Sequence, residues 1–212
     1  MTLETNVQVN MEALRRNEYP GRGIIIGQTP DRSNLVQIYW IMGRSENSRN
    51  RIFIKKGDVV RTAPFDVSKV EDPSLIIYNC SRVQGRGFII TNGDHTDAIM
   101  RATSRNQTFH DALCTQTYES DAPNYTPRIA GMIDLDNGQA YQLAIIKTID
   151  NNPDRLVRYF FNYEIPIASV GHLISTYDGN GEPLPSFTGE PRPVAIVDNI
   201  DDTLNLYWNM LN

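Results

Sequence analysis

Cysteine, histidine and lysine are scarce in this chain of 212 residues, which contains 2, 3 and 4 of them respectively. Cys80 and Cys114 are too few for a disulfide framework, and no C-x-x-C spacing indicates structural zinc. No apolar run approaches the roughly 18 residues that span a bilayer. The first residues also lack the basic-then-apolar pattern of a signal peptide. The sequence therefore predicts a cytoplasmic protein with no membrane partner.

Positive charge is not in excess either, since the formal net charge is -5. Such a chain has no basic field to hold a nucleic-acid backbone without sequence preference. Arginine nevertheless outnumbers lysine by 16 to 4, and guanidinium groups suit carboxylate and phosphate. This favours an anionic small molecule as partner, although a bias in codon use explains the excess equally well. A homo-oligomer is compatible with the sequence, which does not decide the oligomeric state.

The length and composition are those of a globular domain, with 40% hydrophobic and 21% charged residues. One domain is expected for a strand-rich chain of this size. We place it at residues 19–212, after an N-terminal leader at residues 1–18. Internal repeats and low-complexity tracts are absent.

Strand-like segments dominate the chain, and four segments resemble helices. Asp136-Asn137-Gly138 is a turn signal, and the proline-rich tract 181–193 resembles a surface loop. The expected strands are residues 23–27, 36–43, two within the hairpin 51–63, 75–83, 85–93, 128–135, 139–149 and 156–165. The expected helices are residues 9–17, 94–104, 108–118 and 199–211.

The order of these segments is strands, helices, strands and a closing helix, which is not the alternation of a doubly wound parallel sheet. It predicts an α+β fold with antiparallel sheets and helices on their outer faces. Residues 23–27 and 143–149 are apolar at consecutive positions, as expected when both faces of a strand are covered. Two sheets packed face to face, with helices outside each, satisfy that pattern.

The sequence Asp94-His95-Thr96-Asp97 follows Asn92-Gly93 and raises the question of a polar site. We interpret this segment mainly as the start of a helix, with Asp94 as N-cap and Asp97 as the acid of a capping box. Metal binding is disfavoured because the two other histidines lie at no metal-ligand spacing. A third interpretation has His95 or Asn92 touching a ligand at the end of a strand.

Five ordered motifs in residues 19–135 resemble the archaeal-type inosine-monophosphate (IMP) cyclohydrolase family. They are Tyr19-Pro20-Gly21-Arg22 with Gly27, Gly43-Arg44-Ser45 leading to Arg49, Tyr78-Asn79-Cys80, Asn92-Gly93-Asp94-His95-Thr96-Asp97 and Thr126-Pro127-Arg128-Ile129-Ala130. The resemblance implies closure of a formamido-imidazole-carboxamide ribotide to IMP. It also implies a four-layer αββα sandwich, similar to N-terminal-nucleophile hydrolases but without self-processing.

The same resemblance implies catalytic roles for Arg49, Tyr78 and Glu119. Arg49 would hold the substrate, Tyr78 would donate to the formyl oxygen, and Glu119 would move protons. Without the resemblance these residues are a loop arginine, a strand aromatic and an acid at a helix end. The implied substrate-binding residues are Arg44, Asn79, Asn92, His95 and Arg128.

Ring closure needs a fixed pose, a donor for the formyl oxygen and an acid–base group. It requires no covalent intermediate, metal or redox cofactor, so Cys80 has no nucleophilic task and no cofactor is expected. The chain departs from the family in Asp94, which replaces a smaller hydroxyl residue. The loop from Glu119 to Thr126 is also one residue longer.

Three alternatives stay open at this point. Removal of Met1 would expose Thr2 as an N-terminal nucleophile, although the first expected strand begins about twenty residues later. The chain could instead be a purine-nucleotide-binding protein without turnover. It could also be a hydrolase that acts on another amide.

Overall fold

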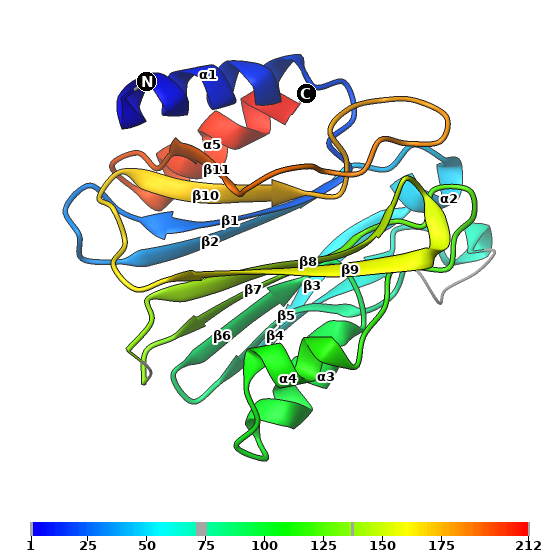
Figure 1. Ribbon diagram of the computed structural model, residues 1–212, viewed down its shortest axis with the longest axis horizontal. Helices are drawn as coiled ribbons and strands as arrows, with labels where there is room; N and C mark the ends of the chain where they lie inside the picture. Colours follow the sequence, from blue (N-terminus) through cyan, green and yellow to red (C-terminus); the bar gives the residue numbers. More distant parts are fainter. Residues whose placement is uncertain (1, 71–75, 137, 212) are drawn as a thin grey trace.

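Two antiparallel sheets form the centre of the computed structural model, which describes residues 2–70, 76–136 and 138–211 (Figure 1). The four-stranded sheet has the order β11-β10-β1-β2, with β1 at Arg22–Gln28, β2 at Leu35–Ile41, β10 at Val170–Ser175 and β11 at Arg192–Ala195. The seven-stranded sheet runs in sequence order from β3 to β9. Its strands are Arg51–Lys56, Val59–Pro64, Asn79–Gln84, Gly87–Thr91, Arg128–Asp134, Tyr141–Ile149 and Asn152–Tyr163.

Strand β1 shows why its residues are apolar at consecutive positions. Ile24 and Ile26 are fully buried between the two sheets, in a cluster with residues such as Ile129 and Leu143. Ile25 points to the opposite face and packs with Leu14 and Tyr207 of the covering helices. Both faces of the strand are therefore covered, as the sequence predicts.

Helices cover the outer face of each sheet (Figure 1). Helices α1 (Leu3–Arg16) and α5 (Ile200–Leu211) pack on the four-stranded sheet. Helices α3 (His95–Thr103) and α4 (Phe109–Cys114) pack on the seven-stranded sheet. Short turns α2 (Glu46–Arg49) and η1 (Val67–Lys69) flank the β3–β4 hairpin. The predicted α+β sandwich, with two sheets and helices outside, is confirmed.

Two helix boundaries differ from the prediction. Helix α1 begins at Leu3 instead of residue 9, because the Thr2 hydroxyl accepts from the Thr5 amide and caps an earlier turn. Helix α4 ends at Cys114 instead of residue 118. The chain then becomes extended, and the Glu119 amide donates to the Thr126 carbonyl. This early end is what directs Glu119 inward.

Strands β10 and β11 were not expected from the sequence. The segment VGHLIS of β10 carries a glycine and a histidine where apolar side chains are usual. Strand β11 is an edge strand and therefore tolerates Pro193. The tract 181–193 is not wholly a surface loop, because Leu184 and Phe187 are buried and its last two residues belong to β11.

Two predictions reach residues that the structure does not describe. The strand expected at 75–83 begins outside the described residues, and β5 itself starts at Asn79. The turn expected at Asp136-Asn137-Gly138 includes Asn137, which also lies outside them. Among the described residues, the structure has no helix with the length and apolar character to cross a membrane.

Candidate active site

A buried ion pair joins the first residue of β1 to the segment after α4. Arg22 Nη1 and Nη2 donate to Glu119 Oε1 and Oε2, each over 3.0 Å. Their side chains are 11% and 5% exposed. Gly21 positions the arginine, because its φ of +68° turns the chain and a Cβ there would lie 2.2 Å from Thr176 Oγ1. Two opposite charges thus face each other between the sheets with bidentate geometry.

The electrostatics of this pair leave Glu119 able to take up a proton. Burial raises the pKa of the Glu119 carboxyl, and Arg22 opposes that shift. Asp121 acts in the same direction as burial. A buried carboxylate with a raised pKa is suited to general acid–base work near neutral pH.

Two tyrosine hydroxyls lie beside the ion pair. The hydroxyl oxygens of Tyr39 on β2 and Tyr78, which precedes β5, are 2.8 Å apart. Burial raises the pKa of both phenols, and Arg22 partly opposes this. Both therefore stay protonated at neutral pH. One hydroxyl donates to the other, so one of the two protons is not used in this contact.

A cavity of about 290 Å³ opens onto the ion pair. Arg22 and Glu119 line it, whereas Tyr39 and Tyr78 are not among the lining residues. Asn47 also lines the cavity, and its buried side-chain oxygen Oδ1 has no hydrogen-bond partner among the described residues. The other lining residues are Tyr19, Met42, Arg44, Ser45, Ser48, Arg51, Ile76, Asp121, Asn124, Thr126, Tyr177 and Leu184.

The lining of the cavity combines aromatic rings with arginine. The rings of Tyr19 and Tyr177 stack with centroids 5.7 Å apart, and the Arg44 guanidinium lies 5.9 Å from the Tyr19 centroid. Arg44 is exposed and donates to the Gly181 carbonyl over 2.9 Å. With Arg22 and Arg51, it gives the cavity three arginines, a set suited to an anionic ligand.

Arg128 connects the predicted residue His95 to the same end of the sandwich. Arg128 Nη1 donates to the Asp94 carboxylate and, over 3.0 Å, to His95 Nδ1. His95 Nε2 lies 3.0 Å from the Ile129 carbonyl oxygen, to which it donates in the matching tautomer. Burial, with Arg128 nearby, lowers the pKa of His95 to about 3, so the imidazole is neutral.

Asp94 is the N-cap residue of α3, as predicted, but the side-chain hydrogen bonds expected of Asp94 and of Asp97 as a capping box do not form. Asp94 makes no side-chain capping bond, because its carboxylate pairs with Arg128. The Asp97 carboxylate accepts from Asn79 Nδ2 and from Arg82 Nη1. The helix start is nevertheless correct, since α3 begins at His95.

Asn79 and Arg82 therefore share a side of β5, contrary to simple alternation. The register shifts where β4 meets β5, so that Arg61 pairs with Asn79 and Val60 with Ser81. This bulge lets Asn79 and Arg82 both reach Asp97 on α3. The structure thus directs Asn79 to the outer helical layer, and Asn79 is not among the residues that line the cavity.

Asn92 and Arg49 are also placed apart from the cavity lining. Asn92 is fully buried, donates to the Pro127 carbonyl and accepts from the Ile129 amide. It thereby ties the end of β6 to the start of β7. Arg49 is exposed at the end of α2, and its Nε donates to the Gly43 carbonyl over 3.0 Å.

The structure thus brings Tyr78 and Glu119 together and adds Arg22, Tyr39 and Arg51, which sequence reasoning did not select. A signal for Arg22 was present: an arginine that opens a wholly apolar strand needs a buried partner. Tyr39 and Arg51 sit in ordinary strand patterns, which give no such signal.

Two other features bear on the alternatives. Thr2 caps α1 on the outer helical layer, away from the ion pair between the sheets. The part of the chain that the structure describes holds no cluster of three or more His, Cys, Asp or Glu side chains that could bind a metal. Metal independence stays a prediction.

A larger hollow, of about 900 Å³, lies between the β5–β6 turn and the α3–α4 connection. Its lining includes Arg86 and Asp136, which pair with each other while mostly exposed. We favour the smaller cavity as the active site because it alone of the two contains the buried Arg22–Glu119 pair.

Comparison with known proteins identifies the family of the chain. A family model described as IMP cyclohydrolase-like protein matches residues 19–212. An IMP cyclohydrolase of Methanococcus aeolicus is 31% identical over 171 residues, which cover 76% of this chain and 82% of that protein. One from Methanocella arvoryzae is 38% identical over 120 residues, covering 54% of this chain and 57% of that protein. One from Methanopyrus kandleri is 28% identical over 163 residues, 75% of each chain.

Proposed function

Because the chain belongs to the IMP cyclohydrolase-like family, we propose that it closes 5-formamidoimidazole-4-carboxamide ribotide to IMP with release of water. The observation that carries the proposal is the buried, bidentate Arg22–Glu119 pair at the cavity. The proposed substrate is a small anionic nucleotide, in keeping with three arginines in the lining.

The reaction sets the tasks of the site. The carboxamide nitrogen attacks the formyl carbon, which forms a C–N bond and turns the formyl oxygen into a hydroxyl. That hydroxyl leaves as water when the formamido nitrogen loses its proton and the C=N bond forms to it, while the carboxamide nitrogen keeps one of its two protons. The site must therefore hold the two substituents together, stabilise charge on one oxygen and carry protons.

Glu119 is our candidate for proton transfer. Its oxygens accept from Arg22, yet each keeps a second lone pair for a substrate N–H. The pKa raised by burial favours proton uptake from the attacking nitrogen. Arg22 fixes the orientation of the carboxylate and keeps its charge paired.

Tyr78 is our candidate donor to the formyl oxygen. If Tyr39 donates to the Tyr78 oxygen, the Tyr78 proton is directed away from that contact and toward the substrate. Arg22 and Arg51 both lower the pKa of Tyr78 against the effect of burial, which strengthens its O–H as a donor. Tyr39 then acts as a positioning residue.

We assign phosphate binding to arginines in and next to the cavity lining. Arg44 and Arg51 line it, and Arg49 follows the lining residue Ser48. We keep Arg49 as a proposed substrate anchor, which would exchange its Gly43 contact for the ligand. Asn47 Oδ1 is free to accept from a ribose hydroxyl.

Arg128 and His95 support the site behind Glu119. Arg128 lowers the pKa of Glu119, and its buried Nε has no hydrogen-bond partner among the described residues. The unpaired Nε–H makes Arg128 a stronger candidate than His95 for direct contact with the substrate. We assign Asn79 and Asn92 to positioning, because their amides bind α3 and the start of β7.

We also infer that the sandwich is the αββα architecture similar to N-terminal-nucleophile hydrolases, used without self-processing. Two sheets with helices outside each support this inference (Figure 1). The capping role of Thr2 supports the absence of a terminal nucleophile. We propose a single domain at 19–212 in a cytoplasmic protein, with residues 1–18 as an addition to it.

The test is direct incubation of the purified protein with the formylated ribotide, followed by hypoxanthine absorbance. We expect turnover that survives dialysis against a strong chelator. Turnover that returns only with added metal would contradict metal independence. Tight binding of IMP without turnover would favour a nucleotide-binding protein, and release of formate would favour an amide hydrolase.

A further inference from the structure

Three side chains of the cavity lining form a hydrogen-bonded chain that the roles assigned above do not use. Tyr177 Oη is hydrogen-bonded to Thr126 Oγ1, and Thr126 Oγ1 donates to Asp121 Oδ2 over 2.5 Å. All three residues line the cavity together with Arg22 and Glu119. Asp121, Thr126 and Tyr177 are called the hydroxyl chain from here on.

The Asp121 carboxylate fixes the direction of the hydrogen bonds in the hydroxyl chain. An ionised carboxylate only accepts, so the single Thr126 hydroxyl proton is used on Asp121. Tyr177 must therefore donate its phenol proton to Thr126. Among the residues that the structure describes, Tyr177 Oη makes no other hydrogen bond. Toward a ligand it thus offers only acceptor lone pairs.

The segment after α4 holds the hydroxyl chain in register with the proposed proton carrier. The Thr126 amide donates to Asp121 Oδ1 over 2.7 Å. The Glu119 amide donates to the Thr126 carbonyl over 3.0 Å. A Cβ at Gly21 would lie 2.7 Å from Tyr177 Cδ2, so the glycine leaves room for this ring. One short segment therefore positions the Glu119 carboxylate and two of the three members of the chain.

Arg22 groups the Tyr177 hydroxyl with the proposed catalytic residues. Burial raises the pKa of Tyr177 and of Tyr78, and the charge of Arg22 opposes the shift in both. Glu119 is bonded to the same guanidinium. Tyr177 is 3% exposed, whereas Asp121 is half-buried. The hydroxyl chain thus runs from a buried phenol in the field of Arg22 to a carboxylate with access to solvent.

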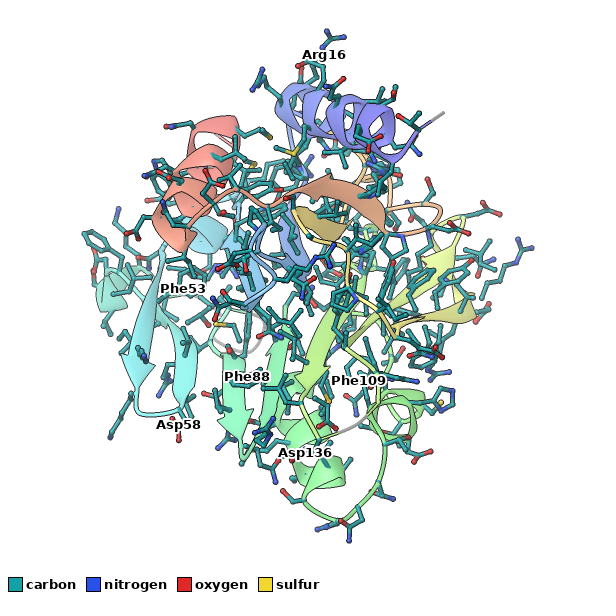
Figure 2. The ribbon with its side chains drawn as sticks, turned by 90° about the vertical axis from the view of Figure 1, so that its left-hand side faces the viewer. Arg16, Phe53, Asp58, Phe88, Phe109 and Asp136 are labelled. Carbon is teal, nitrogen blue, oxygen red and sulfur yellow. The ribbon has the colours of Figure 1, made fainter. Side chains whose placement is uncertain are left out.

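A proton taken up between the sheets needs such a path. Side chains fill this space (Figure 2), and its apolar centre includes Ile24, Ile129 and Leu143. Apolar side chains neither donate nor accept protons, so a proton can pass only through polar groups in contact with one another. The hydroxyl chain provides three such groups in succession.

We propose that Tyr177 accepts the formamido proton in the dehydration step and that a proton passes through Thr126 to Asp121. This inference rests on the proposed function and supplies the acceptor that its second step requires. Glu119 is protonated at that stage, because it has taken up the carboxamide proton. It can therefore act as the acid for the leaving hydroxyl but not as the base for the second nitrogen.

Atoms and electrons balance in this step. The formamido N–H bond breaks, and its electron pair forms the C=N bond while the C–O bond breaks. Glu119 gives its proton to the departing hydroxyl, which leaves as water. Tyr177 Oη takes the formamido proton and gives its own to Thr126, which gives its own to Asp121. Asp121 releases a proton to solvent, from which Tyr78 recovers the one that it gave to the formyl oxygen.

The transfer reverses the hydroxyl chain and thereby matches the product. With Asp121 protonated, each hydrogen bond points the other way, and Tyr177 offers a proton to the ligand. The formamido nitrogen has by then become a ring nitrogen with an acceptor lone pair. Asp121→Asn fixes this second state, because the amide oxygen still accepts from the Thr126 amide while the amide nitrogen donates to Thr126 Oγ1.

The direction of the chain is measured without a ligand, by NMR of tyrosines that are isotope-labelled at Cζ. The resonance missing from Tyr177→Phe is that of Tyr177. Asp121→Asn and Thr126→Val should both shift it in the same direction, because Tyr177 donates in neither variant, although only the first changes the charge. Thr188→Val is the matched control, since that hydroxyl donates to the Asp178 carboxylate over 2.7 Å outside the cavity lining. An unchanged Tyr177 resonance in Asp121→Asn would overturn the proposed direction.

Turnover and product binding test the proton path. Thr126→Val should lower kcat by about 100-fold with little change in KM, and Thr126→Ser should recover most of that loss. Asp121→Asn should lower kcat to a similar extent, yet bind IMP at least as tightly as the unmodified chain in calorimetry. Thr188→Val should behave as the unmodified chain. Weaker IMP binding by Asp121→Asn would overturn the reversal of the chain.

The unmodified chain separates failure of this proposal from failure of the proposed function. If it turns over and Thr126→Val keeps near-normal kcat, the proton path is overturned and the proposed function stands. If it shows no turnover, the proposed function is overturned and the proton path with it. Thermal unfolding checks each variant. Should Thr126→Val not fold, Asp121→Asn, which keeps the shape of the side chain, decides by the same criterion of kcat.

Discussion

The two ends of the space between the sheets bury polar groups in different ways. At the charged end, Arg22 pairs with Glu119 beside Tyr39 and Tyr78. At the neutral end, the Tyr141 hydroxyl lies 2.6 Å from His172 Nδ1. The His172 ring stacks on Tyr163 with centroids 4.1 Å apart.

The difference lies in what each arrangement leaves available. Burial lowers the pKa of His172 to about 4, so its neutral ring accepts from Tyr141 and the pair satisfies itself. The charged end keeps an open carboxylate lone pair, a phenol proton and a cavity. Both ends therefore contain buried polar contacts. What distinguishes a candidate site is a hydrogen-bonding group that still lacks a partner and lies next to a cavity.

The largest expected effect is on stability when the charged pair is broken. Arg22→Met should lower the free energy of unfolding by about 3–5 kcal/mol, because it leaves Glu119 buried without its partner. At about 2–4 °C per kcal/mol for a chain of this size, Tm should fall by roughly 10 °C. The measurement is thermal unfolding at neutral pH.

The matched control is at the neutral end. Tyr141→Phe removes one uncharged hydrogen bond, which contributes only about 1 kcal/mol. Equal losses of Tm in Arg22→Met and Tyr141→Phe would remove the energetic distinction between the two ends.

The next effect concerns turnover. Glu119→Gln and Tyr78→Phe each keep the shape of the side chain but remove a proton-handling group, so kcat should fall by about 100-fold or more. KM should change little. Tyr141→Phe should leave both constants near their normal values.

Arg49→Ala tests the anchor that lies outside the cavity lining. Loss of an anchor should raise KM and lower kcat together, because the reactive pose is released. For the two preceding variants, Tyr78→Phe and Glu119→Gln, near-normal turnover would show that catalysis uses other residues.

Sequence reasoning selected Tyr78 and Glu119 as candidates but not Arg22, the partner of the buried Glu119 carboxylate. Arg22 and Glu119 are 97 residues apart, and only the approach of β1 to the segment after α4 brings them together. Local rules placed Asp94 correctly at the N-cap but not its side-chain contact, because Arg128, 34 residues away, supplies a charged partner. The sandwich was predictable because consecutive apolar positions report burial of both strand faces.

A third effect follows from pH at the neutral end. The pKa of His172 is about 4 in the folded chain, below its ordinary 6.5, so the unfolded chain binds a proton that the folded chain does not. Stability should therefore fall as pH drops from about 6.5 to 4. The double variant His172→Phe, Tyr141→Phe should show a weaker dependence, with the remainder contributed by His95, whose pKa is also lowered.

Urea unfolding at several pH values measures this dependence. The double variant removes donor and acceptor together, so no buried group loses its partner. An unchanged slope against pH in that variant would show that His172 is not the group that titrates.

The smallest effect is expected at Cys80, which lies next to the charged end but takes no part in its chemistry. Its thiol donates to the Val60 carbonyl over 3.3 Å, and burial raises its pKa to about 12. A neutral, engaged thiol is a poor nucleophile. Attack by sulfur would also divert the formyl carbon from the nitrogen already held beside it.

Cys80→Ser should therefore keep most activity and lose at most about tenfold through altered packing, equivalent to about 1.4 kcal/mol of barrier. Cys114→Ser is the matched control, because that cysteine is exposed on α4. Two results together would replace direct closure by a covalent mechanism: a loss of about a thousandfold in Cys80→Ser but not in Cys114→Ser, and a formylated Cys80 detected by mass spectrometry in the unmodified chain. Retained activity would show that the Cys80 thiol is dispensable and that the proton-handling groups of the charged end are carboxylate, phenol, hydroxyl and guanidinium.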